Sequence, residues 1–228
     1  MAHGQGQSRH DLHARATRLA QPHPFSAVKN SGWQTGEALL ARILTERRQD
    51  WQGPGQCTEP AAPDTPNLPP LPTGWTWATV EQLAAPEPNS ITDGPFGSNL
   101  KTEHYMDSGP RVIRLQNIGD AVYVDEEAHI SQAHFERLQK HRVFAHDIVI
   151  AGFGENPPRS CTIPEALGPA IVKADGIRFK PHSSVTPKYM NAALYFRLYD
   201  FSAPSTDARS SGGLGTVRPP IFTVEGVA

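Results

Sequence analysis

Seven prolines lie within residues 53–72 (GPGQCTEPAAPDTPNLPPLP), and this segment constrains the 228-residue chain more than any other feature of the sequence. Proline has no backbone N–H and a fixed φ angle, so the segment cannot sustain a helix or a sheet ladder and favours extended polyproline geometry. We expect a semi-rigid linker here, with separate structures before and after it. A proline-rich binding motif for another protein is the alternative.

A helix is predicted before the linker, over residues 35–51 (TGEALLARILTERRQDW). Thr35 is a suitable N-cap, and Glu37 places a negative charge in the first turn, where it suits the helix dipole. An apolar stripe runs along one face at helical spacing: Leu40, Ile43, Leu44 and Trp51. A helix this short needs a packing partner. The stripe therefore packs either on the chain's own core or, as a projecting coiled-coil-type spacer over 35–52, on another helix.

Residues 73–200 are predicted to form one folded domain. Its expected strands are Arg111–Leu115, Ala121–Val124, Asp147–Gly152, Ser160–Ile163, Ala170–Ala174 and Gly176–Lys180. Its expected helices are a short one after Thr79, one over 131–141 capped by Ser131, and one from Pro187 to about Leu198. Many strands with few helices indicate an α+β fold rather than a βαβ repeat.

The two ends of the chain have compositions that build no core. We expect a disordered leader over 1–34 and a disordered or aberrant tail over 201–228. No run approaches the roughly 18 apolar residues of a membrane span, and residues 1–30 lack the apolar centre of a secretory signal. Cys57 and Cys161 are the two cysteines, which fits reduced thiols in a cytoplasmic protein without a disulfide framework.

The charge balance excludes a strongly basic nucleic-acid binder. The whole chain carries a formal charge of −2, and residues 73–200 hold 12 Lys/Arg against 15 Asp/Glu. Any DNA binding therefore requires a local basic face on an acidic body.

The most informative loop is Thr92–Lys101 (TDGPFGSNLK), in which two turn signals surround one aromatic residue. We expect Phe96 to anchor this loop to the core. Ser98, Asn99 and Lys101 offer polar side chains and a cation that suit a phosphate. A purely structural loop is an equal alternative.

Motifs for catalysis are incomplete. Amino-methyltransferases of nucleic acids carry an Asn-Pro-Pro-aromatic loop, whose aromatic side chain stacks on a flipped-out base. Here Arg159 follows Asn156-Pro157-Pro158 in the aromatic place, which favours a DNA contact by Arg159 over catalysis. An Asp/Glu-x-Lys nuclease motif would need a carboxylate two residues before Lys173, where Ile171 stands. We predict no catalytic residues and no metal site.

Several long blocks occur in one order along residues 36–198: EALLARILTERRQDW, TDGPFGSNLKTEHY, RVIRLQNIGD, ISQAHFERLQKHRV and DIVIAGFGENPPRSCTIPEALGPAIVKADGIRFKP. This order resembles the specificity subunit of type I restriction–modification systems. The first block is similar to the end of that family's central helix, and the others are similar to its second target-recognition domain. A first recognition domain and the family's ending are missing, so the chain resembles a truncated subunit.

The resemblance implies a non-catalytic reader of double-stranded DNA. In the family, modification subunits bind S-adenosylmethionine and methylate adenine, and restriction subunits use ATP and Mg²⁺ to translocate and cut. The expected partners are thus DNA and both kinds of subunit, with no cofactor bound by this chain and no membrane, and a homodimer through the spacer helix is a further association. The alternatives are a fragment of a DNA adenine amino-methyltransferase and a protein-interaction adaptor without a DNA role.

The candidate DNA-binding residues are Ser98, Asn99, Lys101, Arg114, Gln116, Asn117, Arg159, Lys173 and Arg178. Gln116 and Asn117 are the candidate base readers, because amide side chains match the donor and acceptor pattern of a base edge. Arg114 and Arg178 have an equally good alternative role as ion-pair partners of neighbouring strands.

Overall fold

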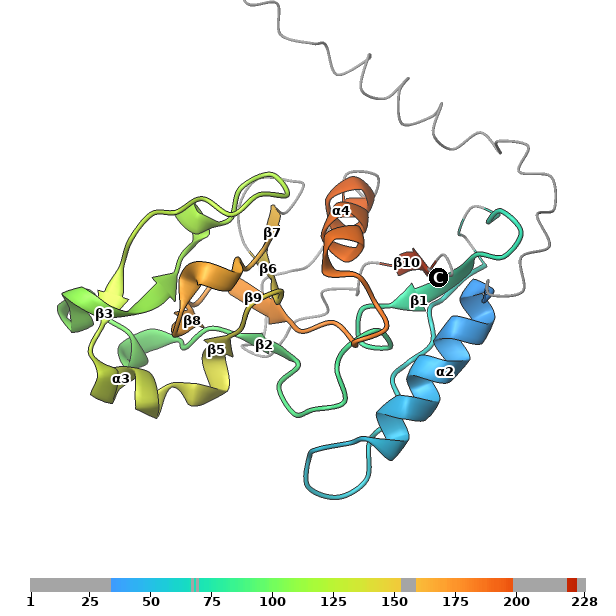
Figure 1. The fold of residues 1–228 in the computed structure, drawn as a ribbon, viewed down its shortest axis with the longest axis horizontal. Coiled ribbons are helices and arrows are strands. Elements are labelled where there is room, and N and C mark those ends of the chain that lie inside the picture. The colour runs from blue at the N-terminus through green and yellow to red at the C-terminus, as the bar shows by residue number, and fades with distance from the viewer. Residues whose placement is uncertain (1–33, 67, 69, 153–158, 199–220, 225–228) are drawn as a thin grey trace, which may run out of the picture.

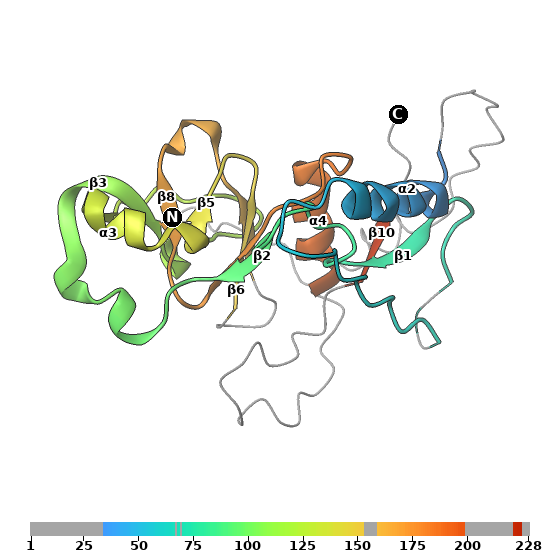
Figure 2. The ribbon, with the colours of Figure 1, turned by 90° about the horizontal axis from the view of Figure 1, so that it is seen from below.

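The computed structural model describes residues 34–66, 68, 70–152, 159–198 and 221–224. These residues form an α+β fold with mixed and antiparallel sheets, as predicted. Helix α2 (Gly36–Gln49) and strand β1 (Thr76–Thr79) lie at one end of the molecule, and helix α3 (Gln132–Arg137) lies toward the other. Helix α4 (Pro187–Leu198) lies between α2 and the four-stranded sheets (Figures 1 and 2).

Among the described residues, the strands form three sheets. The first pairs β1 with β10 (Ile221–Val224). The second is antiparallel, in the order β2 (Ile91–Asp93), β9 (Gly176–Phe179), β6 (Ile148–Ala151) and β7 (Ser160–Thr162). The third is mixed, in the order β4 (His129–Ile130), β3 (Tyr105–Ile113), β8 (Ala170–Val172) and β5 (Arg142–Val143), with β3 and β8 parallel.

Short 3₁₀ helices connect these strands: η1 (Gly97–Asn99), η2 (Thr102–His104), η3 (Leu115–Asn117), η4 (Gln139–His141) and η5 (Glu165–Leu167). The predicted helix over 131–141 is divided between α3 and η4, and Ser131 caps it as expected. The segment after Thr79 forms turns instead of the predicted helix, although Thr79 and Gln82 exchange both hydrogen bonds of a capping box.

The strand predicted over Ala121–Val124 is wrong. Ala121 has a φ of 60°, so the chain reverses direction there, and Tyr123 forms only an isolated bridge with Ile118. Val122 and Val124 are 57% and 38% exposed, which shows that their apolar character does not reflect a buried strand.

Helix α2 does not project from the body, contrary to the spacer interpretation. Leu39 and Ile43 are 4% and 0% exposed and pack in a core that we call the helical cluster, with Leu83 from the β1 side and Met190 and Leu194 from α4. Of the predicted stripe, Ile43 is fully buried and Leu40 packs against the same cluster. The physical reason is that the two buried residues, one turn apart, find apolar partners within the same chain.

Polar contacts also hold α2 to the body. Arg47 is 6% exposed, and its Nη1 donates to the carbonyl oxygens of Ala84 and Ala85 over 2.7 and 3.1 Å. The proline-rich segment runs back along α2, since Arg48 pairs with Glu59 and the Gly36 amide donates to the Gly74 carbonyl. Its described residues contain no helix or strand.

Two further clusters explain why the central strands read as unbroken apolar runs. The inter-sheet cluster lies between the two four-stranded sheets and includes Val149, Ala170 and Val172. The α3 cluster, on the other face of the third sheet, includes Phe135 and Ile171. These two clusters cover both faces of β8, and β6 lies between the inter-sheet cluster and the helical cluster, in which Ile148 is buried. Both alternating sets of side chains in these strands must therefore be apolar.

The expectation of disorder over 201–228 is wrong at Ile221–Val224, because these residues pair with Thr76–Thr79 as β10. The remainder of that tail lies outside the described residues, as do residues 1–33 of the expected leader.

Candidate functional site

Four chain segments meet where strands of both four-stranded sheets end. Strands β2, β3 and β8 end there, and β9 begins there. The Gly94 amide donates to the Gly176 carbonyl over 3.2 Å. A Cβ atom on Gly94 would stand 2.0 Å from the carbonyl carbon of Lys173, so only glycine fits this approach of loop 94–101 to the 173–175 turn.

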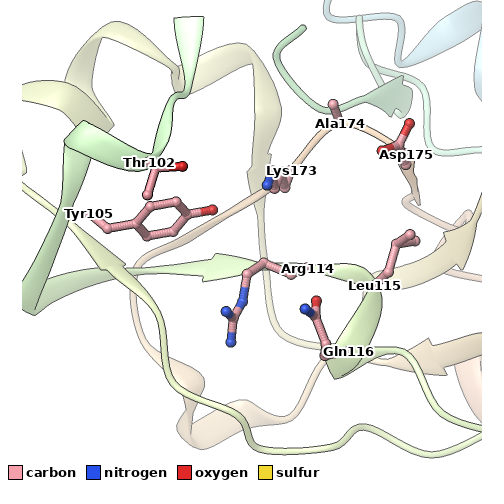
Figure 3. Close-up of a pocket in the computed structure, with 8 residues that line it drawn as sticks. All are labelled: Thr102, Tyr105, Arg114, Leu115, Gln116, Lys173, Ala174 and Asp175. Atoms are coloured by element: carbon pink, nitrogen blue, oxygen red, sulfur yellow. The ribbon is translucent and has the colours of Figure 1, made fainter. Parts of the chain in front are cut away.

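A pocket of about 500 Å³ opens between these segments (Figure 3). It is lined by Thr102, Tyr105, Arg114, Leu115, Gln116, Lys173, Ala174 and Asp175. Three candidates chosen from the sequence, Arg114, Gln116 and Lys173, are therefore brought together although they come from two distant parts of the chain.

The pocket is rich in hydrogen-bond donors. The Lys173 Nζ lies 5.9 Å from the centroid of the Tyr105 ring and forms no ion pair with any described residue. The Tyr105 hydroxyl and the Arg114 Nε are buried, and neither has a hydrogen-bond partner among the described residues. Buried polar groups usually have partners, so this arrangement suits an acceptor-rich ligand such as a phosphate or a base edge.

Arg114 is partly neutralised by its own surroundings. Its Nη2 donates to the Glu127 carbonyl over 3.3 Å and lies 3.9 Å from a carboxylate oxygen of Glu126. The side chain is 24% exposed. Arg114 therefore combines the two roles that its sequence suggests: it forms an ion pair with a neighbouring segment, and it lines the pocket.

Loop 94–101 reaches the surface beside this pocket. Phe96 is 54% exposed, so the expectation that it anchors the loop to the core is wrong. His134 of α3 holds the loop instead, since its Nε2–H donates to the Asn99 carbonyl over 2.7 Å. Ser98 and Asn99 are exposed in η1, and the exposed Lys101 has its Nζ 3.7 Å from Glu103.

A second histidine fastens the beginning of this loop. His141 is 4% exposed, and its Nδ1–H donates to the Asp93 carbonyl over 2.5 Å. Burial lowers the pKa of His141, and the hydrogen bond to Asp93 opposes this shift. His134 and His141 thus hold the loop in place from α3 and η4.

Two of the candidates do not belong to this surface. Asn117 is 0% exposed, and its amide donates to the carbonyl oxygens of Val124 and Glu126. Arg178 is 3% exposed and pairs with Asp147 and Glu87. Neither residue can contact a duplex in this structure. The Asn117 amide and the Arg178 guanidinium are buried, and their donors bind acceptors of the same chain.

Arg159 is exposed immediately before β7, and its carbonyl oxygen accepts a hydrogen bond from the Ala151 amide. Gly152 directly follows Ala151, and its amide donates to the carbonyl oxygen of Asp175, a residue that lines the pocket. This contact places the end of β6 beside the pocket rim. The Asn156-Pro157-Pro158 motif lies outside the described residues.

Sequence reasoning missed Thr102, Tyr105 and Asp175. Tyr105 stands in the block TDGPFGSNLKTEHY, four residues after the candidate Lys101, and Asp175 follows the candidate Lys173 by two. Proximity to a candidate was the only available signal, since neither residue belongs to a motif.

The described part of the chain contains no group of three or more His, Cys, Asp or Glu residues placed to hold a metal ion. None of its helices is long and apolar enough to span a bilayer.

Comparison with known proteins gives structural matches. No family model matches the sequence, and no curated protein matches it significantly. The fold is similar to a chain from a solved structure described as the structural basis of complex assembly and conformational transition of the type I R-M system, with a TM-score of 0.50 and 11% identity. The match covers 96% of this chain and 44% of that one. A second match, at a TM-score of 0.46 and 11% identity, is the HsdS subunit from Thermoanaerobacter tengcongensis, of which 43% is covered by 95% of this chain. The chain thus spans less than half the length of either match, and the similarity concerns the fold.

Proposed function

We propose that this chain recognises double-stranded DNA in a sequence-specific way, as the specificity subunit of a type I restriction–modification complex or as a part of one. The observation that carries the proposal is the pocket at the strand ends, where Arg114, Gln116 and Lys173 converge. The order of sequence blocks and the fold similarity to a chain of a type I R-M system support it independently.

The distribution of charge supports a DNA-facing role for this end of the molecule. The domain carries more acidic than basic residues, so a duplex can approach only where cations lack local partners. Arg178 and Lys180 are matched by Glu87 and Asp147 away from the pocket. Lys173 has no such carboxylate among the described residues and lies beside an aromatic ring.

In this proposal the chemistry belongs to partner subunits. Modification subunits supply S-adenosylmethionine and methylate adenine, and restriction subunits supply ATP-dependent translocation and cleavage. The chain itself binds DNA in the cytoplasm and is not an enzyme. A second copy, docked through the exposed face of α2, supplies the second recognition domain, and Leu40 and Leu44 are the partly exposed apolar residues of that face.

The deciding experiment co-expresses the full chain with its cognate modification subunit and maps methylated adenines across the host genome. We expect one methylated motif, and a palindromic one, because a two-fold pair of identical readers recognises a two-fold site. Lys173→Ala should reduce methylation at all sites, since phosphate contacts carry no sequence information. Gln116→Ala should relax one position of the motif.

Lys188→Ala is the matched control, because Lys188 is an exposed lysine on α4 that does not line the pocket. An asymmetric split motif would exclude the two-copy arrangement. Absence of methylation, with the modification subunit still captured by the chain, would favour the adaptor alternative. Methyl transfer by the lone chain would favour the methyltransferase alternative.

A further inference from the structure

Arg142 in β5 lies close to two phenylalanine rings. Its guanidinium carbon is 5.7 Å from the centroid of Phe135 and 4.6 Å from that of Phe144. Phe135 is buried in the α3 cluster, whereas Phe144 is 40% exposed. Contacts of this kind stabilise a guanidinium and restrict its rotamers, so the group is held in place before any ligand binds.

The Arg142 guanidinium has no acceptor within the described part of the chain. No carboxylate there forms an ion pair with it, and its buried Nε has no hydrogen-bond partner. A guanidinium carries five N–H donors and no acceptor, so an oxyanion is the ligand that its shape and charge match.

The surroundings of Phe144 leave Arg142 as the unmatched charge. Arg178 and Lys180 also lie within 5.4 Å of the Phe144 centroid. These two cations are balanced by two carboxylates, Glu87 and Asp147. The patch around Phe144 therefore carries a net charge of about one positive unit, centred on Arg142.

The pairing of β5 with β8 places Arg142 near the pocket residue Lys173. Arg142 is paired with Ile171 of β8, and Lys173 follows Ile171 by two residues. Alternation along a strand places Ile171 and Lys173 on one face, roughly 7 Å apart. Lys173 over Tyr105 and Arg142 beside Phe135 thus flank the same α3 cluster, in which Ile171 and Phe135 are buried and against which Tyr105 packs.

We infer that Arg142, which is in contact with the rings of Phe135 and Phe144, is an oxyanion site that binds a backbone phosphate of the DNA duplex. The inference rests on the proposed function and adds a contact outside the pocket. The site positions the duplex and reads no base, because a phosphodiester is the same at every step of the sequence.

The test measures DNA binding by the full chain in complex with its modification subunit, over a salt series. The probes are two 30-base-pair duplexes, one with and one without the methylated motif. Arg142→Ala should weaken binding to both duplexes by the same factor and reduce the slope of log K against log salt concentration by about one. Arg142→Lys should keep the slope and lose part of the affinity, because charge remains but the planar fork is lost.

Lys188→Ala is the matched control, since Lys188 is an exposed lysine on α4 that belongs neither to the pocket nor to the exposed face of α2, and it should change neither quantity. If Arg142→Ala does not fold, Arg142→Lys decides the matter, because unchanged affinity for both duplexes would overturn the inference. An unchanged slope in a folded Arg142→Ala complex would overturn it as well. Loss of modification-subunit capture with normal DNA binding would also overturn it, by assigning the site to a protein carboxylate.

The same experiment separates the inference from the proposed function. If the wild-type complex binds neither duplex, the proposed function fails. If Lys173→Ala weakens binding and Arg142→Ala does not, the proposed function stands and only the Arg142 site is rejected.

Discussion

The Nε of Arg178 donates a hydrogen bond to a carboxylate oxygen of Asp147 over 2.6 Å, and the two side chains are 4% and 2% exposed. This ion pair joins β9 to the turn before β6, and the Phe144 amide donates to the same carboxylate oxygen. Arg178, which the sequence suggests as a DNA contact, therefore stabilises the interior of the fold through a buried ion pair.

Breaking this pair should destabilise the fold without a specific effect on DNA. We expect Arg178→Met to lower the free energy of unfolding by about 3–5 kcal/mol, because it leaves the buried Asp147 carboxylate uncompensated. Arg48→Ala, which breaks the exposed pair with Glu59, should cost less than about 1 kcal/mol. Urea unfolding measures both. A stable Arg178→Met protein with weakened DNA binding would show that Arg178 contacts DNA after all.

Two neighbouring apolar residues of α2 should behave differently. Ile43→Ala should cost about 2–5 kcal/mol of unfolding free energy, because the side chain is 0% exposed in the helical cluster. Leu44→Asp should change the melting temperature little, because Leu44 is partly exposed. Loss of modification-subunit capture by Leu44→Asp, at unchanged stability, would identify this face of α2 as the docking surface. Equal destabilisation by both changes would contradict the structure of α2 described here.

Gly94 should tolerate no side chain. In Gly94→Ala the new Cβ meets the backbone of Lys173 and Ala174, so loop 94–101 and the 173–175 turn must separate. We expect a lower melting temperature and weaker DNA binding together. Gly97→Ala is the control in the same loop: its φ of 60° costs about 1 kcal/mol, but nothing lies within 4 Å of the added methyl group. A normal melting temperature for Gly94→Ala would argue against this close approach.

Stability should fall as the pH drops below about 6.5. Burial lowers the pKa values of His141 and His182 from the usual 6.5. Between the folded pKa and 6.5 the unfolded chain therefore binds more protons, so the free energy of unfolding rises with pH through this window and levels off above it. Urea titrations at pH 5.5, 6.5 and 7.5 measure the effect.

His141→Asn should flatten this profile, because the asparagine amide keeps a donor for the Asp93 carbonyl and does not titrate. His146→Gln is the control, since His146 lies on the surface with a side chain that is 58% exposed. An unchanged profile in His141→Asn would assign the pH dependence to other groups.

Local sequence patterns predicted the helices and strands that are marked by apolar runs or by capping residues. Strands β6 and β8 were foreseen because both faces are buried, which forces an unbroken apolar run. Helix α2 was foreseen from its stripe and from Thr35, whose side chain accepts the Ala38 amide as an N-cap. Lys173 and Arg114 were chosen as cations of an acidic domain, and the structure places each of them directly after the end of a buried strand rather than inside the longer strands that were predicted.

The errors concern partners that lie far away in the sequence. Arg178 reads as an exposed cation, yet its carboxylates come from Glu87 and Asp147. The stripe of α2 was identified in part, since Ile43 is buried whereas Leu39 was not included and Leu44 is partly exposed. Nothing near the stripe in the sequence indicates that Met190 and Leu194 will cover it. Burial of a polar or apolar side chain is decided by tertiary contacts, which single-sequence patterns do not contain.

The parallel pairing of β3 with β8 also affects the order in which parts of the fold form. Arg111 is paired with Ala170, and 58 residues lie between them in the sequence. Closing so long a loop is slow compared with forming the β6–β7 hairpin, and parallel pairings of this kind delay folding. Arg114 and Lys173 extend from the ends of these two strands, so the pocket between them should be among the last parts to form. During refolding, native-like secondary structure should therefore appear before DNA binding does.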